Sequence, residues 1–374
     1  MRTIKGWCPG AHRPMMSGDG LIARIRPRLG RLTTEQVLGL CDISCTHGNG
    51  IIDLTSRANL QMRGMVEANH AMVLDRLAAL DLLDADPSVE ARRNIIATPL
   101  WHSGDMTERL HHDIVACLPA LPDLPAKMGI ALDTGPTPML GAASADFRFE
   151  QGGDGALILR ADGSNRGWAI DADDAPQALI EMAHWFCNTG GRMAGRMAHH
   201  LLTTPLPPDW ETHLARPMTN PLQAGRLNEA QIFGAPFGSL NARALAALVT
   251  DTKTTGLRCT PWRLFLLEEA ETVADTHGFV TDANDPILRA HACSGAPACA
   301  SATVETRTIA RVLAPKHPKG LHVSGCSKGC AHPRPAPLTL VGDNGAYDLV
   351  ENGHPWDQPR KRGLSADDLK TIPD

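Results

Sequence analysis

The sequence predicts an α+β protein made of two pseudo-repeated halves, each with a small half-domain followed by a mixed α/β domain. Two observations support this prediction. Segments with period-two spacing and segments with helical spacing of apolar residues alternate along the chain. A proline-rich stretch over 204–225 interrupts this pattern, which then restarts with similar turns and strands. We therefore expect a cleft between two related halves, where ligand sites concentrate in proteins.

Length and composition limit the classes of function. The chain has 374 residues, and 43% of them are hydrophobic, which excludes a disordered chain. Its net charge of −5 argues against a general attraction to nucleic acid or to an anionic membrane. It has neither an apolar run near the ~18 residues of a membrane helix nor the apolar core of a secretory signal. We expect a cytoplasmic monomer in which the ten cysteines do not form a disulfide framework and some of them bind metal or react.

The individual elements follow from apolar spacing and from Gly and Pro breaks. Thr33 and Gln36 have the capping-box spacing of a helix start, and this helix should run to about Cys45. Strands are also expected over 21–26, 51–55, 126–132, 145–149, 156–160 and 167–171, and helices over 66–81 and 174–202. The expected units are an irregular arm (1–20), half-domain 1 (21–84), α/β domain 1 (85–203), the linker (204–225), half-domain 2 (226–285) and α/β domain 2 (286–374).

Short matches relate the two halves. Residues 30–33 have a counterpart in 238–241, and residues 53–57 have one in 258–262. Few of the matched residues are identical, so the matches indicate a repeat without establishing it. If the halves are related by a pseudo-dyad, they enclose a shared cleft.

Four cysteines form the most specific pattern in the chain. Cys293 and Cys299 make a C-x5-C element, and Cys326 and Cys330 make a C-x3-C element. Four thiolates on two loops can hold a [4Fe–4S] cluster, with one thiolate for each iron. Neighbouring glycines allow backbone N–H groups to approach the sulfurs, and one lysine adds positive charge. These neighbours are Gly295, Gly325, Gly329 and Lys328.

Two alternatives remain for these cysteines. Zinc is the competing metal, although its structural sites usually separate paired ligands by two to four residues. Four unrelated buried cysteines are the other alternative, which the glycine-flanked pairs make weaker. The remaining cysteines are expected to be packing residues, as Cys41 and Cys45 are on one helix face. Cys8, in the irregular arm, has no assignment.

At this point the chain resembles a known superfamily. Its cysteine pattern, placed after a repeated half, is similar to that of the sirohaem-type nitrite and sulfite reductases. Within that superfamily the chain most resembles the precorrin-3B synthase family of aerobic cobalamin biosynthesis. The closer resemblance lies in residues 6–20, 52–64, 322–333 and 340–350. It spans most of the chain and implies ferredoxin-like half-domains, a tetrapyrrole-binding first α/β domain and a cluster-binding second one.

The resemblance implies an oxidoreductase of the monooxygenase type. The family binds one [4Fe–4S] cluster, uses O2 to hydroxylate precorrin-3A at C-20, and forms a γ-lactone from the ring A acetate. NADH is the ultimate electron source, and a mononuclear non-haem iron is also associated with the family. This chain has no Gly-x-Gly-x-x-Gly fingerprint after a strand, so we expect a separate reductase to deliver the electrons.

Two rival functions remain. The first is a sirohaem-dependent nitrite or sulfite reductase, which would contain bound sirohaem. The second is a non-catalytic electron-transfer protein or a zinc-stabilised binding protein, which would have no affinity for a tetrapyrrole.

A precorrin carries many carboxylates, so its pocket needs cations. Arginine suits this role because its planar fork pairs with a carboxylate through two hydrogen bonds. Alternate strand residues share one face, which places Arg57, Asn59, Gln61 and Arg63 together. On spacing alone, a solvated polar face explains them equally well. The resemblance adds weight to Arg57, which matches an anion-binding arginine of the reductases.

The resemblance also implies roles for Arg93 and Lys127, each at the position of a basic site residue in the reductases. The reductases have a second lysine two residues after the first. This chain has Gly129 there. The difference argues against sulfite reduction, which needs a dense cationic pocket, and leaves space over the ring face where O2 could bind.

Histidines are the candidates for ligands of a second iron, which often has two His and one carboxylate. The adjacent candidates are His111, His112 and Asp113, and then His199 and His200. Neighbouring residues on a regular element point apart, so neither group is an obvious chelate. His322 and His332 flank the C-x3-C element and could hydrogen-bond cluster sulfur or substrate carboxylates instead. No ligand of the second iron is assigned.

Overall fold

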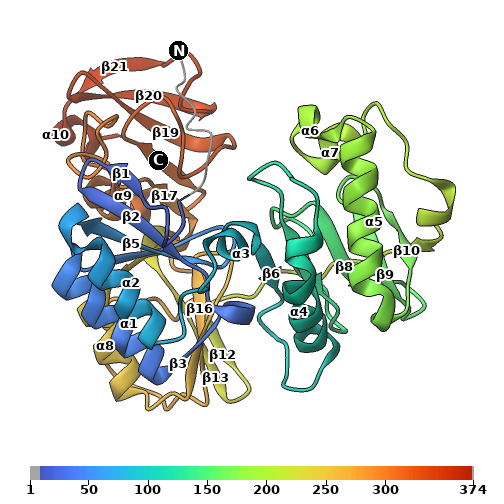
Figure 1. Ribbon diagram of the computed structural model, residues 1–374. Coiled ribbons are helices and arrows are strands. Elements are labelled where there is room, and N and C mark those ends of the chain that lie inside the picture. Colours follow the sequence, from blue (N-terminus) through green and yellow to red (C-terminus); the bar gives the residue numbers. More distant parts are fainter. Residues whose placement is uncertain (1–8, 373–374) are drawn as a thin grey trace.

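The computed structural model describes residues 9–372 and contains four β-sheets with helices packed against them (Figure 1). Two sheets form a central body, a third lies in a separate lobe at the right of Figure 1, and the fourth lies at the top of the central body. This is the α+β architecture that the sequence predicts. Cys8 lies outside the described residues.

Each central sheet takes one strand from the other half of the chain. The first sheet has the order β1-β2-β5-β4-β14, and the second has the order β12-β13-β16-β15-β3. β14 (Ser239–Asn241) therefore completes the sheet of the first half, and β3 (Arg31–Thr33) completes that of the second. This reciprocal exchange is compatible with two pseudo-repeated halves. The other strands are β1 (Met15–Ser17), β2 (Gly20–Ile25), β4 (Ile51–Leu54), β5 (Leu60–Met65), β12 (Gly225–Leu227), β13 (Ala230–Gly234), β15 (Gly256–Cys259) and β16 (Leu264–Glu268).

The same turn precedes both exchanged strands. Leu29 and Phe237 have positive φ values of 54° and 62°, and each is followed by a glycine that also has positive φ. Backbone in this left-handed region reverses the chain tightly, so each short 3-10 turn, η1 (Arg28–Gly30) and η6 (Pro236–Gly238), leads directly into its strand. The expected match between 30–33 and 238–241 thus corresponds to two turns of one conformation.

Helices cover one face of the two central sheets. α1 (Thr34–His47) begins with the predicted capping box, because the Thr33 hydroxyl accepts the Gln36 N–H and the Gln36 side chain accepts the Thr33 N–H. This helix is confirmed. α2 (His70–Ala79) follows the turn η2 (Glu67–Asn69) and is shorter than the expected helix over 66–81. α8 (Ala242–Asp251) is the partner of α1 in the second half, and the two helices pack over one shared apolar core.

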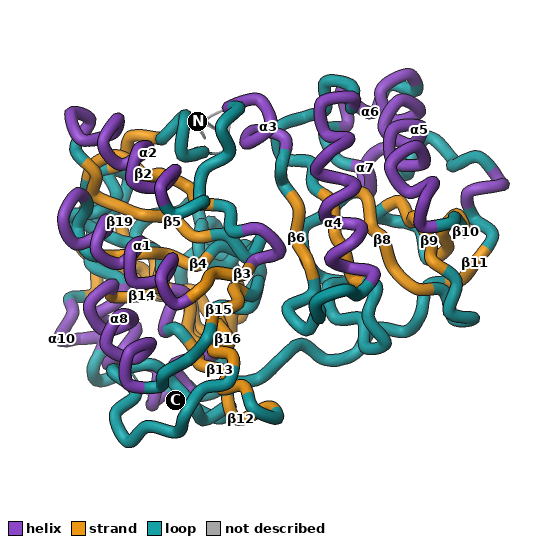
Figure 2. Tube along the Cα trace, turned by 60° about the horizontal axis from the view of Figure 1, so that its bottom comes forward, coloured by secondary structure: helices purple, strands orange, loops and turns teal. Residues whose placement is uncertain are grey.

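The separate lobe is a six-stranded sheet with two long helices (Figure 2). Its strand order is β11-β10-β9-β8-β7-β6, and β6, β7 and β8 run parallel. The strands are β6 (Ile95–Ala97), β7 (Ile130–Asp133), β8 (Phe147–Gln151), β9 (Leu157–Ala161), β10 (Arg166–Ala169) and β11 (His213–Leu214). The helices and turns are α3 (Pro87–Arg92), α4 (Met106–Cys117), η3 (Leu118–Ala120), η4 (Ala172–Asp174), α5 (Ala175–Asn188), α6 (Gly191–Ala194), α7 (Met197–His200) and η5 (Pro208–Trp210).

The single helix expected over 174–202 is wrong in its second half. α5 ends at Asn188, and two one-turn helices follow. Gly190 and Gly195 have φ values of 97° and 73°, which no α-helix contains. The apolar spacing continues through this region, but the glycines break the backbone hydrogen-bond ladder. The strand expected over 126–132 likewise begins only at Ile130.

The fourth sheet has the order β17-β18-β19-β20-β21, with its first three strands parallel. Its strands are β17 (Ala290–Ala292), β18 (Leu321–Ser324), β19 (Ala336–Asp343), β20 (Ala346–Gly353) and β21 (Lys361–Leu364). Its helices and turns are η7 (Pro286–Arg289), α9 (Arg307–Leu313), η8 (Ala314–Lys316) and α10 (Ala366–Leu369). Across residues 9–372, no helix is both long and apolar enough to cross a membrane.

Candidate functional site

The four predicted cluster cysteines lie on two loops at one edge of the fourth sheet. Cys293 directly follows β17, and Cys326 comes two residues after β18. Because these strands are parallel neighbours, their carboxyl ends bring both loops together. Partial burial of the Cys330 thiol, and then the proximity of Cys326, Cys293 and Cys299, raise the pKa of Cys330. The structure thus brings the two loops that carry the four cysteines to one edge of the sheet, although up to 37 residues separate these cysteines in the sequence.

Glycines shape both loops as the sequence predicts. The backbone N–H of Gly325 points to the Cys293 sulfur at 3.3 Å, and a Cβ on Gly325 would lie only 2.5 Å from the Ala302 Cβ. Gly295 has a φ of +67°, and a Cβ there would lie 2.7 Å from the Thr306 hydroxyl. Lys328 donates to the Ser301 hydroxyl at 2.8 Å, which holds its charge beside the loops. A larger residue at either glycine would therefore force the two loops apart.

Four cysteines on two loops are the donor set that a [4Fe–4S] cluster requires. In the part of the chain that the structure describes, no three His, Cys, Asp or Glu side chains are placed to share one metal ion. In a four-iron cluster each cysteine binds a different iron, so the four sulfurs are spread wider than the ligands of one ion. Four convergent thiols with a backbone N–H directed at one of them suit that arrangement. The ligand role of each cysteine stays a prediction.

The polar face of the first sheet reaches the cysteine loop through Arg63. This side chain is buried and forms ion pairs with Asp19 at 3.0 Å and with Asp53 at 3.6 Å. It also donates to the carbonyl of Ala298, inside the C-x5-C loop, at 3.3 Å. The Ser17 hydroxyl donates to the same carbonyl. The Arg63 guanidinium therefore already contacts protein groups, and its contact with substrate stays a prediction.

Arg57 and Lys127 come together where the first sheet meets the separate lobe. Arg57, in the turn between β4 and β5, donates to the Lys127 carbonyl and to the Ser144 hydroxyl. The Lys127 side chain is exposed beside this contact. The structure thus brings these two predicted residues side by side, although they are far apart in the sequence.

Gln61 and Arg93 each contact an arginine that the sequence analysis passed over. Gln61 accepts two hydrogen bonds from Arg24 on the neighbouring strand. Arg93 is buried at the end of α3, where it pairs with Asp84 at 2.8 Å and donates to the carbonyl of Arg26. Asn59 is buried on the same strand face. The missed signal is the Arg-x-Arg alternation at the end of the strand expected over 21–26.

Three histidines pack together beside the cysteine loops. His291 and His322 are register partners on β17 and β18, and the His332 ring lies against His291 in a tilted arrangement with 3.9 Å between the ring centroids. Burial is the main cause that lowers the pKa of His291 to about 2 and that of His322 to about 4. Both rings are therefore neutral at neutral pH. His322 is fully buried, and neither of its ring nitrogens has a hydrogen-bond partner within the described part of the chain.

The other candidates for a second iron lie apart. His111 is buried in α4, where burial lowers its pKa to about 4, whereas the adjacent His112 is exposed. His200 is buried against Phe186 and Trp185, and His199 is exposed. Each pair points apart, as expected for neighbours on a helix.

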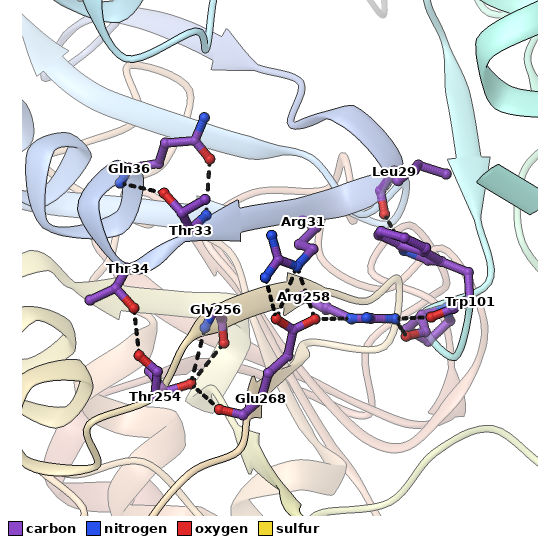
Figure 3. Close-up of polar contacts among 11 residues, drawn as sticks. Leu29, Arg31, Thr33, Thr34, Gln36, Trp101, Thr254, Gly256, Arg258 and Glu268 are labelled. Carbon is purple, nitrogen blue, oxygen red and sulfur yellow. Dashed lines mark hydrogen bonds and ion pairs between the residues drawn. The ribbon is translucent and has the colours of Figure 1, made fainter. Parts of the chain in front are cut away.

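A cavity of about 810 Å³ lies between the separate lobe and the second sheet. Trp101, Arg258 and Glu268 line it, and Figure 3 shows their contacts. None of the predicted cysteines or substrate-binding residues lines this cavity. It is therefore distinct from the predicted substrate site.

Known proteins are similar to this chain in sequence. Residues 13–80 match the model of the nitrite/sulfite reductase ferredoxin-like half domain, which includes β2, β4 and β5. Precorrin-3B synthase of Sinorhizobium sp is 29% identical over 387 aligned positions, which cover 93% of this chain and 83% of that protein. The chain is similar to precorrin-3B synthase over nearly its whole length.

The reductases are more distant from this chain. Ferredoxin–nitrite reductase of Synechococcus elongatus is 28% identical, but the match covers only 37% of this chain and 29% of the reductase. The solved structure of the NirA protein of Mycobacterium tuberculosis covers 94% of this chain and 79% of its own, with a TM-score of 0.63 and 18% identity. This likeness establishes the nitrite/sulfite reductase-type fold, and the named relatives are enzymes.

Proposed function

We propose that this chain is a precorrin-3B synthase, which hydroxylates precorrin-3A at C-20 with O2 and closes a γ-lactone from the ring A acetate. The observation that carries the proposal is the match to precorrin-3B synthase over nearly the whole chain. The match to nitrite reductase is confined to about a third of the chain. The tetrapyrrole substrate and the O2 dependence come from that homology and remain part of the proposal.

The proposed reaction balances with two electrons and two protons. One oxygen atom of O2 enters the substrate, and the other leaves as water. NADH is the proposed source of the electrons, and a separate reductase is the proposed carrier. We propose that a [4Fe–4S] cluster is bound by Cys293, Cys299, Cys326 and Cys330. Such a cluster, when bound, transfers single electrons.

The residues of this chain bind and orient the ring in this proposal. Arg57 and Lys127 offer positive charge at the junction between the central body and the separate lobe. Gln61 and Asn59 offer hydrogen bonds along the same strand face, and Arg63 and Arg93 are further candidates. Fixed donors around a ring of carboxylates can select one orientation and thereby place C-20 and the ring A acetate together.

Gly129 favours the synthase over the reductase. A Cβ at Gly129 would lie 3.0 Å from the Asn94 carbonyl and 3.1 Å from the Asn94 side-chain nitrogen. A lysine at this position, where the reductases have their second lysine, would therefore require Asn94 to move. With one lysine in place of two, the site has less charge for a small anion such as sulfite.

The proposal is tested by anaerobic incubation of the purified protein with precorrin-3A, an electron source and a measured addition of O2. We expect a product heavier by one oxygen atom, labelled by 18O2, and no extractable sirohaem. Bound sirohaem together with six-electron reduction of nitrite or sulfite would establish the reductase instead. A colourless zinc protein without affinity for precorrin-3A would contradict both functions.

The same preparation tests the cysteine assignment. The Cys326→Ser substitution should abolish the broad absorption near ~400 nm and the labile sulfide, because one iron loses its thiolate. Cys117→Ser, at the end of α4, is the matched control and should leave the absorption and the labile sulfide unchanged. Equal iron and sulfide in the two variants would contradict the assignment.

A further inference from the structure

The hairpin formed by β1 and β2 packs directly against the C-x5-C loop, residues 293–299. A Cβ on Gly18, at the tip of the hairpin, would lie only 2.9 Å from the Pro297 carbonyl oxygen. The hydroxyl of Ser17 donates to the Ala298 carbonyl at 3.1 Å. The backbones of the hairpin tip and the loop therefore touch, with no room for a side chain on Gly18.

Arg63 of β5 holds the hairpin and the loop together. Its Nη2 donates to the Ala298 carbonyl and to the Ser17 hydroxyl, both at 3.3 Å. Its Nε and Nη2 also donate to the two carboxylate oxygens of Asp19, each at 3.0 Å. Such a two-point pair fixes the plane of a guanidinium as well as its position. Arg63 is buried, so its charge is held in one place beside the loop.

The first residue of the C-x5-C loop is tied to the same group of charges. Asp53 pairs with Arg63 at 3.6 Å and with Arg307 at 2.9 Å. Arg307 begins α9, and the hydroxyl of Thr306, the residue before it, donates to the Cys293 carbonyl at 2.6 Å. One ion network therefore reaches the loop at two points, the carbonyls of Cys293 and Ala298.

The cation of this network that contacts the loop directly is Arg63. Asp19 and Asp53 bind its guanidinium and partly balance its charge. Charges in buried positions are screened less by salt and solvent than charges on the surface. Reduction of a cluster bound at the cysteines would add one negative charge beside the loop. A fixed cation there favours that reduction, whereas a fixed anion opposes it.

We propose that Arg63 is a positioning residue for the C-x5-C loop and that its charge raises the reduction potential of the cluster bound there. This inference rests on the proposed [4Fe–4S] cluster, and it gives Arg63 a role other than direct contact with the substrate. Asp19 keeps the guanidinium against the Ala298 carbonyl and sets how much of its charge the cluster experiences.

The test is an anaerobic redox titration of the cluster-containing protein, followed by visible absorption and by electron paramagnetic resonance of the reduced cluster. Arg63→Gln removes the cation and should lower the equilibrium constant for one-electron reduction by ~10-fold, a fall of ~59 mV. Asp19→Asn removes an anion and should raise the potential. Arg63→Lys keeps the charge but loses the planar fork, so its potential should lie between those of the wild type and Arg63→Gln.

The opposite signs separate a charge effect from simple damage to the loop. A loosened loop would shift the potentials of Arg63→Gln and Asp19→Asn in the same direction, and that result would overturn the inference. Unchanged potentials in both variants would also overturn it. If Arg63→Gln fails to fold or to retain a cluster, the upward shift expected for Asp19→Asn and the potential of Arg63→Lys decide the question.

Arg28→Gln is the matched control. Arg28 and its ion-pair partner Asp81 are both exposed, so this variant should keep the potential and the resonance spectrum of the wild type. A wild-type protein that holds no iron–sulfur cluster would overturn the proposed cluster, and this inference with it. A wild-type cluster whose potential does not respond to the Arg63 and Asp19 substitutions would overturn the inference alone.

Discussion

Asp133 shows how one buried carboxylate shapes the loop beside the candidate site. It ends β7, and its Oδ2 accepts the backbone N–H groups of Met139 and Leu140 at 2.8 and 2.7 Å. Its Oδ1 is buried and has no hydrogen-bond partner among the residues that the structure describes. The loop held in this way leads to Ser144, which accepts a hydrogen bond from Arg57. Burial raises the pKa of Asp133 to about 6.

This raised pKa predicts a specific dependence of stability on pH. The folded protein binds the Asp133 proton more tightly than the unfolded chain does, so this contribution to stability is lost as the pH rises through about 6. Asp133→Asn removes the titration. Between pH 4.5 and 7.5 the wild type should lose ~2 kcal/mol of unfolding free energy relative to this variant, since one pKa unit corresponds to ~1.4 kcal/mol.

Urea unfolding of both proteins at several pH values measures this difference. Asp367→Asn, at an exposed position in α10, is the control and should follow the wild type at every pH. A constant difference between wild type and Asp133→Asn across the pH range would contradict a raised pKa.

At the scale of elements, local signals near the ends of helices and strands decide most of the secondary structure. The capping box at Thr33 starts α1, and Asn241 caps α8 in the same way by accepting the Ala244 N–H. Each cap residue is the last residue of an exchanged strand, so each cap joins a helix start to the partner sheet. These caps therefore stabilise the junction of the two halves as well as the helices.

Removal of the first cap has a predictable cost. Thr33→Ala leaves the Gln36 N–H without its side-chain acceptor and should lower the unfolding free energy by ~1 kcal/mol. Thr33→Ser keeps the hydroxyl and should retain most of the wild-type stability. Denaturant unfolding measures both variants; equal losses in the two would mean that the cap contributes nothing.

At the scale of the whole molecule, ion pairs between distant segments join the units. Arg31 of the first half and Arg258 of the second both pair with Glu268 (Figure 3). Arg258 also donates to the carbonyls of Pro99 and Trp101 and stacks over the Trp101 ring at 4.5 Å. One side chain therefore connects both halves of the central body with the separate lobe.

Arg258→Ala should destabilise the protein by ~2 kcal/mol, because it leaves a partly buried carboxylate and two carbonyls with fewer partners. Arg360→Ala, which breaks the exposed pair with Glu351, is the control and should cost well under ~1 kcal/mol. Thermal unfolding of the two variants compares these costs. A loss no larger than that of the control would show that the contact does not hold the lobe.

The sequence by itself determined the fold class, the start of α1, the cysteine pattern and the resemblance that led to precorrin-3B synthase. These features depend on short-range signals: residue spacing, a helix cap and the fixed gaps of a motif. Spacing also predicted that alternate residues from Arg57 to Arg63 share a face, but it could not identify their partners.

Only the tertiary structure decided which charges remain available to a ligand. Arg63 and Arg93 are both predicted substrate-binding residues, yet Asp19, Asp53 and Asp84 already pair with them. Arg26 was not among the predicted site residues, and its Nε and Nη1 are buried without a hydrogen-bond partner among residues 9–372. The physical reason is that an ion pair depends on distances between segments far apart in the chain. Residue type sets the charge, whereas the packing of the separate lobe and the arm against the first sheet sets how much of it is neutralised.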